Sequence, residues 1–280
     1  MESRQPFESQ GMCLLRQLLL HGKRVFNSED AKQAARLEKI PLNQLNKIIS
    51  NLAKLGRLHR LRRGLYVSVG LLPKQIDTHP FIISAFLTQS SMISHWSALQ
   101  YHGLTEQIPR IVTASTTNKI VTPSMRERKS HNHKKKHAWE INGVRYEYMT
   151  IQEKNFFGYE KIWPEEDLYA LITDTERTIL DLFIYPALFG GIGEALGILE
   201  NALPSINVKK LVEYAIRYDK KSVIKRLGWA LEYFGVPAKD FAPLLKAPIH
   251  YFCRLDSSSP ALGKSDKKWM IQNNLMDQKK

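Results

Sequence analysis

Cysteine and long apolar runs are the two features that this sequence most clearly lacks. The 280 residues include only Cys13 and Cys253, 240 positions apart, and neither belongs to a CxxC pair. That scarcity excludes a disulfide scaffold, a zinc ribbon and a CxxC redox motif, and it favours a reducing, cytoplasmic location. The longest stretch without a charged side chain, Thr78–Thr105, contains three histidines and several hydroxyl groups, so we expect no membrane span and no membrane partner. The apolar run at 12–20 is interrupted by a charged and an amide side chain, and it does not resemble a secretory signal.

Acidic residues are scarce relative to basic ones, and the imbalance is uneven along the chain. The whole chain has 41 Lys and Arg against 27 Asp and Glu, a formal net charge of +14. Residues 1–75 hold 14 basic and 5 acidic side chains, residues 76–150 hold 9 and 5, and residues 151–280 hold 18 and 17. A basic N-terminal segment beside a nearly neutral body suggests a polyanion-binding module attached to a part with another task. The alternative is a basic protein with no specific polyanion partner.

The first quarter of the chain predicts helices followed by strands. Apolar side chains recur at helical spacing through Gln10–His21. Ser28 is the expected N-cap of a second helix, which runs through Lys39. A third helix is expected over Leu42–Leu55, with a proline at its start and a glycine after its end.

The third predicted helix has two chemically distinct faces. One side collects six apolar side chains at about 100° per residue, namely Leu42, Leu45, Ile48, Ile49, Leu52 and Leu55. The opposite side carries amides, a hydroxyl and lysines, which are groups that reach base edges and phosphates in DNA. We therefore predict DNA contacts by Asn43, Asn46, Lys47, Ser50 and Lys54. A merely solvated polar face is the alternative.

A basic hairpin is expected directly after this helix. Apolar and basic residues alternate through 57–61, an apolar run follows at 65–69, and Gly64 supplies the turn. Three helices followed by a hairpin is the order of a winged helix-turn-helix, whose third helix enters the major groove while the wing contacts the backbone or the minor groove. The DNA contacts predicted here are Arg57, His59, Arg60, Arg62, Arg63 and Tyr66. Small winged helices also serve as protein-interaction modules, which is the alternative for residues 1–75.

The rest of the chain predicts a larger domain over residues 78–255. Its expected elements are helices over Pro80–Gln89 and Ser91–Gly103, a strand over Ile108–Thr116, a hairpin around Asn142-Gly143, and helices from Glu165 onward. A linker at 71–77 precedes this domain and a polar tail at 256–280 follows it. The predicted fold class is therefore α+β, with an N-terminal winged helix-turn-helix followed by a mixed, mostly helical α+β domain.

Signals for catalysis or for a metal are weak. A carboxylate cluster is formed by Asp174, Glu176 and Asp181. Yet Thr173–Glu176 has a capping-box pattern, and Arg177 is spaced for ion pairs within a helix. The histidines of the basic loop 122–137 are interleaved with lysines, which repel a cation, and His95 and His102 are expected to be core or hydrogen-bonded histidines. We predict no enzyme activity, no metal and no cofactor.

Six short strings matter together. They are Arg62–Val67 (RRGLYV), Ile93–Leu99 (ISHWSAL), His102–Pro109 (HGLTEQIP), Asp174–Asp181 (DTERTILD), Gly190–Ile192 (GGI) and Lys225–Gly228 (KRLG). Through them, the chain resembles the AbiEi family, the antitoxin half of bacterial type IV toxin–antitoxin systems that act in abortive infection. The resemblance spans about residues 10–255 and leaves the basic insertion at 122–137 unassigned.

The resemblance implies two tasks. One is repression by a winged helix that binds inverted repeats in its own promoter, so the expected partner is double-stranded operator DNA, with two copies on paired half-sites. The other is an antitoxin domain that counters a cognate toxin of nucleotidyltransferase type, directly or functionally. The alternative is a DNA-acting enzyme such as a nuclease, targeted by the winged helix. A nuclease needs clustered carboxylates with a lysine near a strand, and Glu153-Lys154 and residues 174–176 match that pattern poorly.

Overall fold

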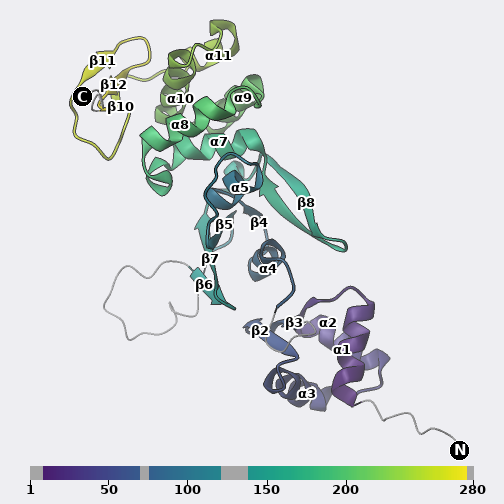
Figure 1. Ribbon diagram of the computed structural model, residues 1–280. Helices are drawn as coiled ribbons and strands as arrows, with labels where there is room; N and C mark the ends of the chain where they lie inside the picture. The colour runs from purple at the N-terminus through teal and green to yellow at the C-terminus, as the bar shows by residue number, and fades with distance from the viewer. Residues whose placement is uncertain (1–8, 70–75, 121–137, 276–280) are drawn as a thin grey trace, which may run out of the picture.

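A computed structural model describes residues 9–69, 76–120 and 138–275 of the chain. It shows a mixed α+β protein in which an N-terminal module, a central sheet, a group of helices and a small C-terminal sheet follow one another along the molecule (Figure 1). The basic loop at 122–137, with its three histidines, and most of the linker at 71–77 lie outside the described residues. In the described ranges, no helix combines the length with the apolar character that crossing a bilayer requires.

The N-terminal module, residues 9–69, combines helices with an antiparallel sheet. Its elements are α1 (Gln10–Leu20), β1 (Val25–Asn27), α2 (Ser28–Leu37), α3 (Leu42–Lys54), β2 (Leu58–Arg62) and β3 (Leu65–Ser68), with strand order β1-β3-β2. The N-cap predicted at Ser28 is wrong by one residue. The side-chain oxygen of Asn27 accepts hydrogen bonds from the amides of Glu29 and Asp30 at 2.7 and 3.0 Å, and the Asp30 carboxylate accepts one from the Asn27 amide at 2.9 Å. This reciprocal capping box fixes the start of α2.

The sheet of the N-terminal module is covered on both faces. On one face, Phe26 and Leu58 pack with the helices α1, α2 and α3. The other face contributes to the apolar cluster of the central sheet through Val25, Leu61, Leu65 and Val67. Side chains alternate between the faces of a strand, so each strand serves two cores at once. An isolated N-terminal module would therefore expose an apolar face that is buried in the intact chain.

A six-stranded sheet occupies the centre of the molecule. Its strands, in spatial order, are β6 (Ala138–Ile141), β7 (Val144–Thr150), β5 (Ile111–Thr116), β4 (Ser91–Ile93), β9 (Leu168–Thr173) and β8 (Tyr159–Glu165). The predicted Asn142-Gly143 hairpin is confirmed, since β6 and β7 pair in antiparallel register around it. Helix α4 (Pro80–Leu87) covers one face through Ile82 and Ile83. Helix α5 (Trp96–Tyr101) follows β4 and lies beside β5, where the Thr113 amide donates to Ser97 Oγ at 2.9 Å.

Two helix predictions in this region are wrong. Residues 91–93 of the helix predicted over Ser91–Gly103 form β4, which is buried and hydrogen-bonded on both edges. Residues 168–173, expected to be helical, form β9. Short apolar runs of this kind fit a buried strand and a buried helix equally well by periodicity, and only the neighbouring strands decide between them.

Helices dominate the chain after β9. They are α7 (Thr175–Ile184), η2 (Pro186–Phe189), α8 (Ile192–Ala202), α9 (Val208–Tyr218), α10 (Lys221–Tyr233) and α11 (Ala238–Leu245), and a short η1 (Glu153–Asn155) precedes β8. Every residue of α7 from Glu176 to Ile184 is buried. Helices α8, α9 and α10 contact α7, which therefore links the central sheet to the helical part.

The segment predicted to be a polar tail, 256–280, is folded in the structure as far as residue 275. This segment contains β11 (Lys264–Asp266) and β12 (Ile271–Asn273), which form a small sheet with β10 (Cys253–Arg254). Trp269 is fully buried against the helical part. A Cβ atom at Gly228 of α10 would lie 2.0 Å from the Trp269 ring. The glycine that ends the KRLG string therefore makes room for this ring.

Candidate functional site

Helix α3 presents the polar face that the sequence predicts. Leu45, Ile49 and Leu52 are buried. Leu42 and Leu55 are 44% and 73% exposed, so the predicted apolar face is wrong at its two ends, which reach past the underlying core. All five predicted polar contacts are exposed, namely Asn43, Asn46, Lys47, Ser50 and Lys54. Their spacing keeps them within one side of the helix, free of the module's core.

The hairpin of β2 and β3 turns at Gly64, whose φ of +73° lies in the left-handed region that glycine tolerates. Arg57, Arg60 and Arg63 are exposed. His59 and Tyr66 are only half-exposed, and the Tyr66 ring stacks on Phe26 with 5.7 Å between ring centroids. The hairpin therefore offers arginines to a ligand, while much of Tyr66 belongs to the core.

Arg62 has a different environment from the other arginines. It lines a cavity of about 400 Å³ between the N-terminal module and the central sheet, together with Ser90 and Asp167. Its side chain is exposed and lies on the side of the hairpin that meets the rest of the chain. Of the four arginines predicted to contact DNA, Arg62 is thus the one that lines this cavity.

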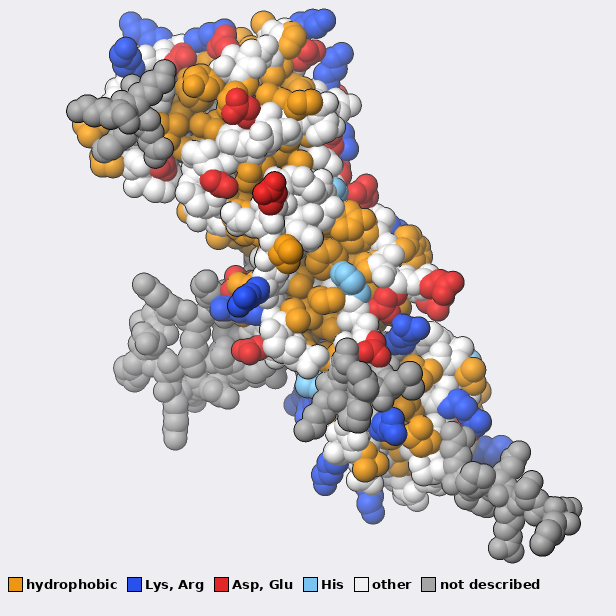
Figure 2. Space-filling view, in the orientation of Figure 1, with side chains coloured by type: hydrophobic (Ala, Val, Ile, Leu, Met, Phe, Trp, Pro, Cys, Tyr) orange, Lys and Arg blue, Asp and Glu red, His pale blue; other side chains and the backbone are white. Residues whose placement is uncertain are grey.

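The positive charge of this surface is uncompensated. Three other cations of the module are paired. Lys23 forms an ion pair with Asp30 at 3.1 Å, Arg24 with Glu165 at 3.4 Å, and Lys32 with Glu29 at 3.1 Å. In the part of the chain that the structure describes, no carboxylate pairs with Lys47, Lys54, Arg57, Arg60 or Arg63. Figure 2 shows Lys and Arg side chains distributed over this end of the molecule. The arrangement suits a ligand with many negative charges.

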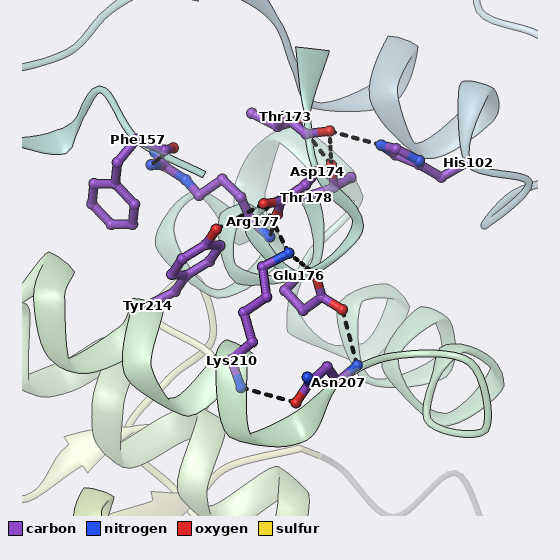
Figure 3. A network of polar contacts seen from close by, with 10 residues as sticks. All are labelled: His102, Phe157, Thr173, Asp174, Glu176, Arg177, Thr178, Asn207, Lys210 and Tyr214. Atoms are coloured by element: carbon purple, nitrogen blue, oxygen red, sulfur yellow. Dashed lines mark hydrogen bonds and ion pairs between the residues drawn. The ribbon is translucent and has the colours of Figure 1, made fainter. Parts of the chain in front are cut away.

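Two carboxylates of the DTERTILD string, Asp174 and Glu176, form a second polar site (Figure 3). Asp174 caps α7 through the Arg177 amide at 2.8 Å and accepts a hydrogen bond from the Tyr214 hydroxyl at 2.8 Å. Glu176 accepts hydrogen bonds from Lys210 Nζ at 2.8 Å and from the Asn207 amide at 2.9 Å. The predicted capping box at 173–176 is therefore wrong, since the cap is Asp174 and Glu176 instead holds the start of α9.

The pKa values in this network follow from these contacts. Burial raises the pKa of Glu176, but the hydrogen bonds from Lys210 and the Asn207 amide outweigh it, and the net pKa is below the ordinary value. Burial and the hydrogen bond to the Asp174 carboxylate raise the pKa of Tyr214 to about 12. Both carboxylates are thus committed to tying α7 to α9, which is a structural use.

Arg177 makes the predicted ion pair within α7, but in the interior. It is 0% exposed, and its Nε donates to Asp181 Oδ1 at 3.0 Å. Its Nη1 donates to the carbonyl oxygens of Asn155 and Phe157 at 2.7 and 3.0 Å. A Cβ atom at Gly158 would lie 2.8 Å from Arg177 Cβ. This arginine therefore fixes the loop that leads into β8.

The two histidines that flank α5 have the hydrogen bonds that the sequence predicts. His95 Nδ1 lies 2.8 Å from Ser94 Oγ, and His102 Nε2 lies 2.7 Å from the Thr173 carbonyl oxygen. Burial lowers the pKa of His95 and favours its neutral form. In the described residues, no group of three or more His, Cys, Asp or Glu side chains could hold a metal ion.

Sequence reasoning missed two exposed aromatic rings, Trp163 of β8 and Tyr169 of β9. Trp163 lies where the sequence predicted no element, and Tyr169 lies where it predicted a helix. The usable signal was the alternation of Tyr159, Lys161 and Trp163, which places one face of a strand in solvent.

Comparisons with known proteins inform the fold. No family model matches the chain, and no curated protein matches it. Among solved structures, the chain is similar to the crystal structure of the RV2827C protein from Mycobacterium tuberculosis. The two share 14% identity with a TM-score of 0.62, over 96% of this chain and 92% of that one. At that identity the likeness concerns the fold alone.

Proposed function

We propose that the N-terminal module is a winged helix-turn-helix and that the chain is a DNA-binding transcriptional repressor. Helix α3 is the recognition helix, and the β2–β3 hairpin is the wing. The observation that carries the proposal is one exposed surface on which the polar face of α3 continues into unpaired arginines of the hairpin. Amides and a hydroxyl on a helix suit base edges in the major groove, and the surrounding cations suit phosphates.

Charge favours DNA over a protein partner for this surface. Residues 1–75 carry 14 basic side chains against 5 acidic ones, whereas residues 151–280 are nearly balanced. Protein interfaces are usually depleted in lysine, while DNA interfaces are strongly positive. A protein partner of this surface would have to supply carboxylates for the unpaired cations.

The decisive experiment measures operator binding. Duplexes of the promoter and of a scrambled sequence are titrated with the full chain and with an Asn46→Ala/Ser50→Ala variant. If these side chains touch bases, the variant loses roughly 1–3 kcal/mol of discrimination per contact while its affinity for scrambled DNA stays nearly unchanged. Lys32→Ala is the control, since Lys32 is paired with Glu29 on α2. If the double variant discriminates operator from scrambled DNA as well as the wild type does, α3 is not the helix that contacts the bases.

Autoregulation at a paired site is part of the proposal. One winged helix covers a short half-site, and specific affinity usually requires two in register. The resemblance to the AbiEi family supports inverted repeats upstream of the operon. Footprinting is expected to show two protected half-sites; one unpaired site, or none in the promoter, would contradict it.

For the body, residues 78–255, we propose an antitoxin role against a toxin of nucleotidyltransferase type. The support is the sequence resemblance, together with a nearly neutral body much larger than a winged helix needs. The test is co-expression with the neighbouring gene, which the proposal expects to encode a nucleotidyltransferase-like protein, scoring growth rescue. Point variants of the full chain are preferable to truncations, because the N-terminal module shares an apolar cluster with the central sheet. We expect Arg60→Ala/Arg63→Ala to lose repression and keep rescue. Loss of both would mean that neutralisation depends on DNA binding.

We propose no catalytic role. The carboxylates that a nuclease would need at 174–176 are held by Lys210, Tyr214 and the Asn207 amide. A nuclease assay on plasmid DNA with Mg²⁺ tests this directly. Cleavage by the wild type that is abolished in an Asp174→Asn variant would favour the enzyme instead.

A further inference from the structure

The β8–β9 hairpin and the end of α5 expose three aromatic rings. Both elements lie outside the N-terminal module (Figure 1), although Tyr169 lines the same cavity as Arg62. Tyr101, Trp163 and Tyr169, which we name the aromatic patch, are 48%, 58% and 46% exposed. The Trp163 and Tyr169 rings lie 5.4 Å apart between centroids. Large aromatic rings grouped in solvent are uncommon on a monomer and are enriched at the centres of protein interfaces.

A cavity lies beside Trp163 at one end of the patch. It measures about 330 Å³ and is lined by Trp163, Tyr101, Phe81 and His79, among others. Aromatic faces attract cations, and the hairpin already shows this, because Lys161 Nζ lies 4.5 Å from the centre of the Tyr169 ring. Burial lowers the pKa of His79, so its ring is neutral near pH 7 and does not repel a cation.

Most charged side chains of the β8–β9 hairpin are acidic. Residues 159–169 contain four carboxylates and one lysine, although the whole chain carries +14. Glu165 pairs with Arg24, while Glu160, Glu166 and Asp167 are exposed and pair with no cation in the described residues. Figure 2 shows acidic side chains at the outer end of this hairpin, beside hydrophobic ones. Carboxylates repel phosphates, which argues against base stacking of a nucleic acid and favours a basic partner.

The backbone of β8 is poorly suited to pair with a strand of a partner protein. β8 is an edge strand of the six-stranded sheet. Pro164 has no amide to donate, and the register with β9 shifts between Ile162 and Glu165. A proline, a bulge and an outward lysine are features that prevent another strand from adding to an edge. Recognition must therefore come from side chains.

We propose that the aromatic patch docks a basic segment of a partner protein, which inserts an arginine or lysine side chain into the cavity beside Trp163. The neighbouring carboxylates attract the segment, and the rings of Trp163 and Tyr101, which line the cavity, hold the cation. This interaction uses the opposite sign of charge from DNA binding, and none of the predicted DNA contacts lines the cavity beside Trp163.

Three labelled octapeptides, alternating serine with arginine, lysine or glutamate, test the proposal by fluorescence anisotropy with the full chain. We expect the arginine peptide to bind best and the glutamate peptide not to bind. Trp163→Ala is expected to weaken binding of the arginine peptide about tenfold or more. Glu166→Lys/Asp167→Lys is expected to weaken it comparably, and more so at low salt.

The matched control is Tyr233→Ala, which removes a ring that is 67% exposed on α10. That variant should bind the arginine peptide as the wild type does. Thermal unfolding, measured in parallel, should give the same midpoint for all variants, which shows that they are folded. This readout does not depend on DNA binding, so failure of this proposal is distinguishable from failure of the proposed function. No binding of the arginine peptide, equal binding by Trp163→Ala, or single-stranded oligothymidylate binding that depends on Trp163 would each overturn the proposal.

Discussion

Removing two arginines from the β2–β3 hairpin, the proposed wing, should change how operator affinity depends on salt. Arg60 and Arg63 are exposed, and neither pairs with a carboxylate among the residues that the structure describes. If each neutralises one DNA phosphate, binding releases counterions in proportion to the number of contacts. Arg60→Ala/Arg63→Ala should therefore weaken binding to operator and to scrambled DNA by a similar factor.

The magnitude follows from the number of contacts. Each lost phosphate contact lowers the slope of log affinity against log salt by about 0.9, so two losses lower it by about 1.8. Between about 50 and 200 mM salt, the gap in affinity between wild type and variant should narrow by about 12-fold. An uncharged contact would leave the gap nearly constant across that range.

Anisotropy titrations at four or more salt concentrations measure this slope. Lys32→Ala removes one charge of the same sign from α2 and should leave the slope within error. Arg62→Ala should lower the slope less than Arg63→Ala, because Arg62 lines the cavity toward the central sheet. A double variant with an unchanged slope, intact in its thermal unfolding, would refute the wing assignment.

Three further outcomes concern stability. Gly228→Ala should lower the free energy of unfolding by roughly 1–3 kcal/mol or more, because its new methyl group meets the buried Trp269 ring; an unchanged urea midpoint would show that the ring can shift. Leu65→Ala should cost about 2–5 kcal/mol, since Leu65 is 3% exposed in the cluster shared with the central sheet, and calorimetry should still show one transition for both parts. The lowered pKa of Glu176 means that its contribution is complete above its ordinary pKa of 4.5 and is lost as pH falls through the folded value. The stability gap between wild type and Glu176→Gln should thus shrink below about pH 4 in denaturant titrations, and a gap that widens on acidification would contradict the Lys210 hydrogen bond.

Much of the N-terminal module could be predicted from the sequence, because its signals are local. The spacing of leucines sets α3, and Gly64 sets the turn of the hairpin. Asn142-Gly143 likewise sets the turn of the β6–β7 hairpin. In each case, residues within one or two turns of the chain carry the whole pattern. The exposed polar face of α3 followed directly, since helical spacing dictates which side chains share a side.

Only the tertiary structure decided the rest, where the relevant neighbours are distant in sequence. β4 and β9 are strands because each lies inside a sheet built from distant segments, as in the pairing of Ile93 with Ile172, 79 positions apart. In the sequence, Trp269 lies within a predicted polar tail, whereas in the structure its ring packs against Gly228. The turn arginines Arg62 and Arg63 look equivalent in sequence, yet only one lines the cavity toward the central sheet. Side-chain environment depends on what packs from elsewhere in the chain, which local spacing does not encode.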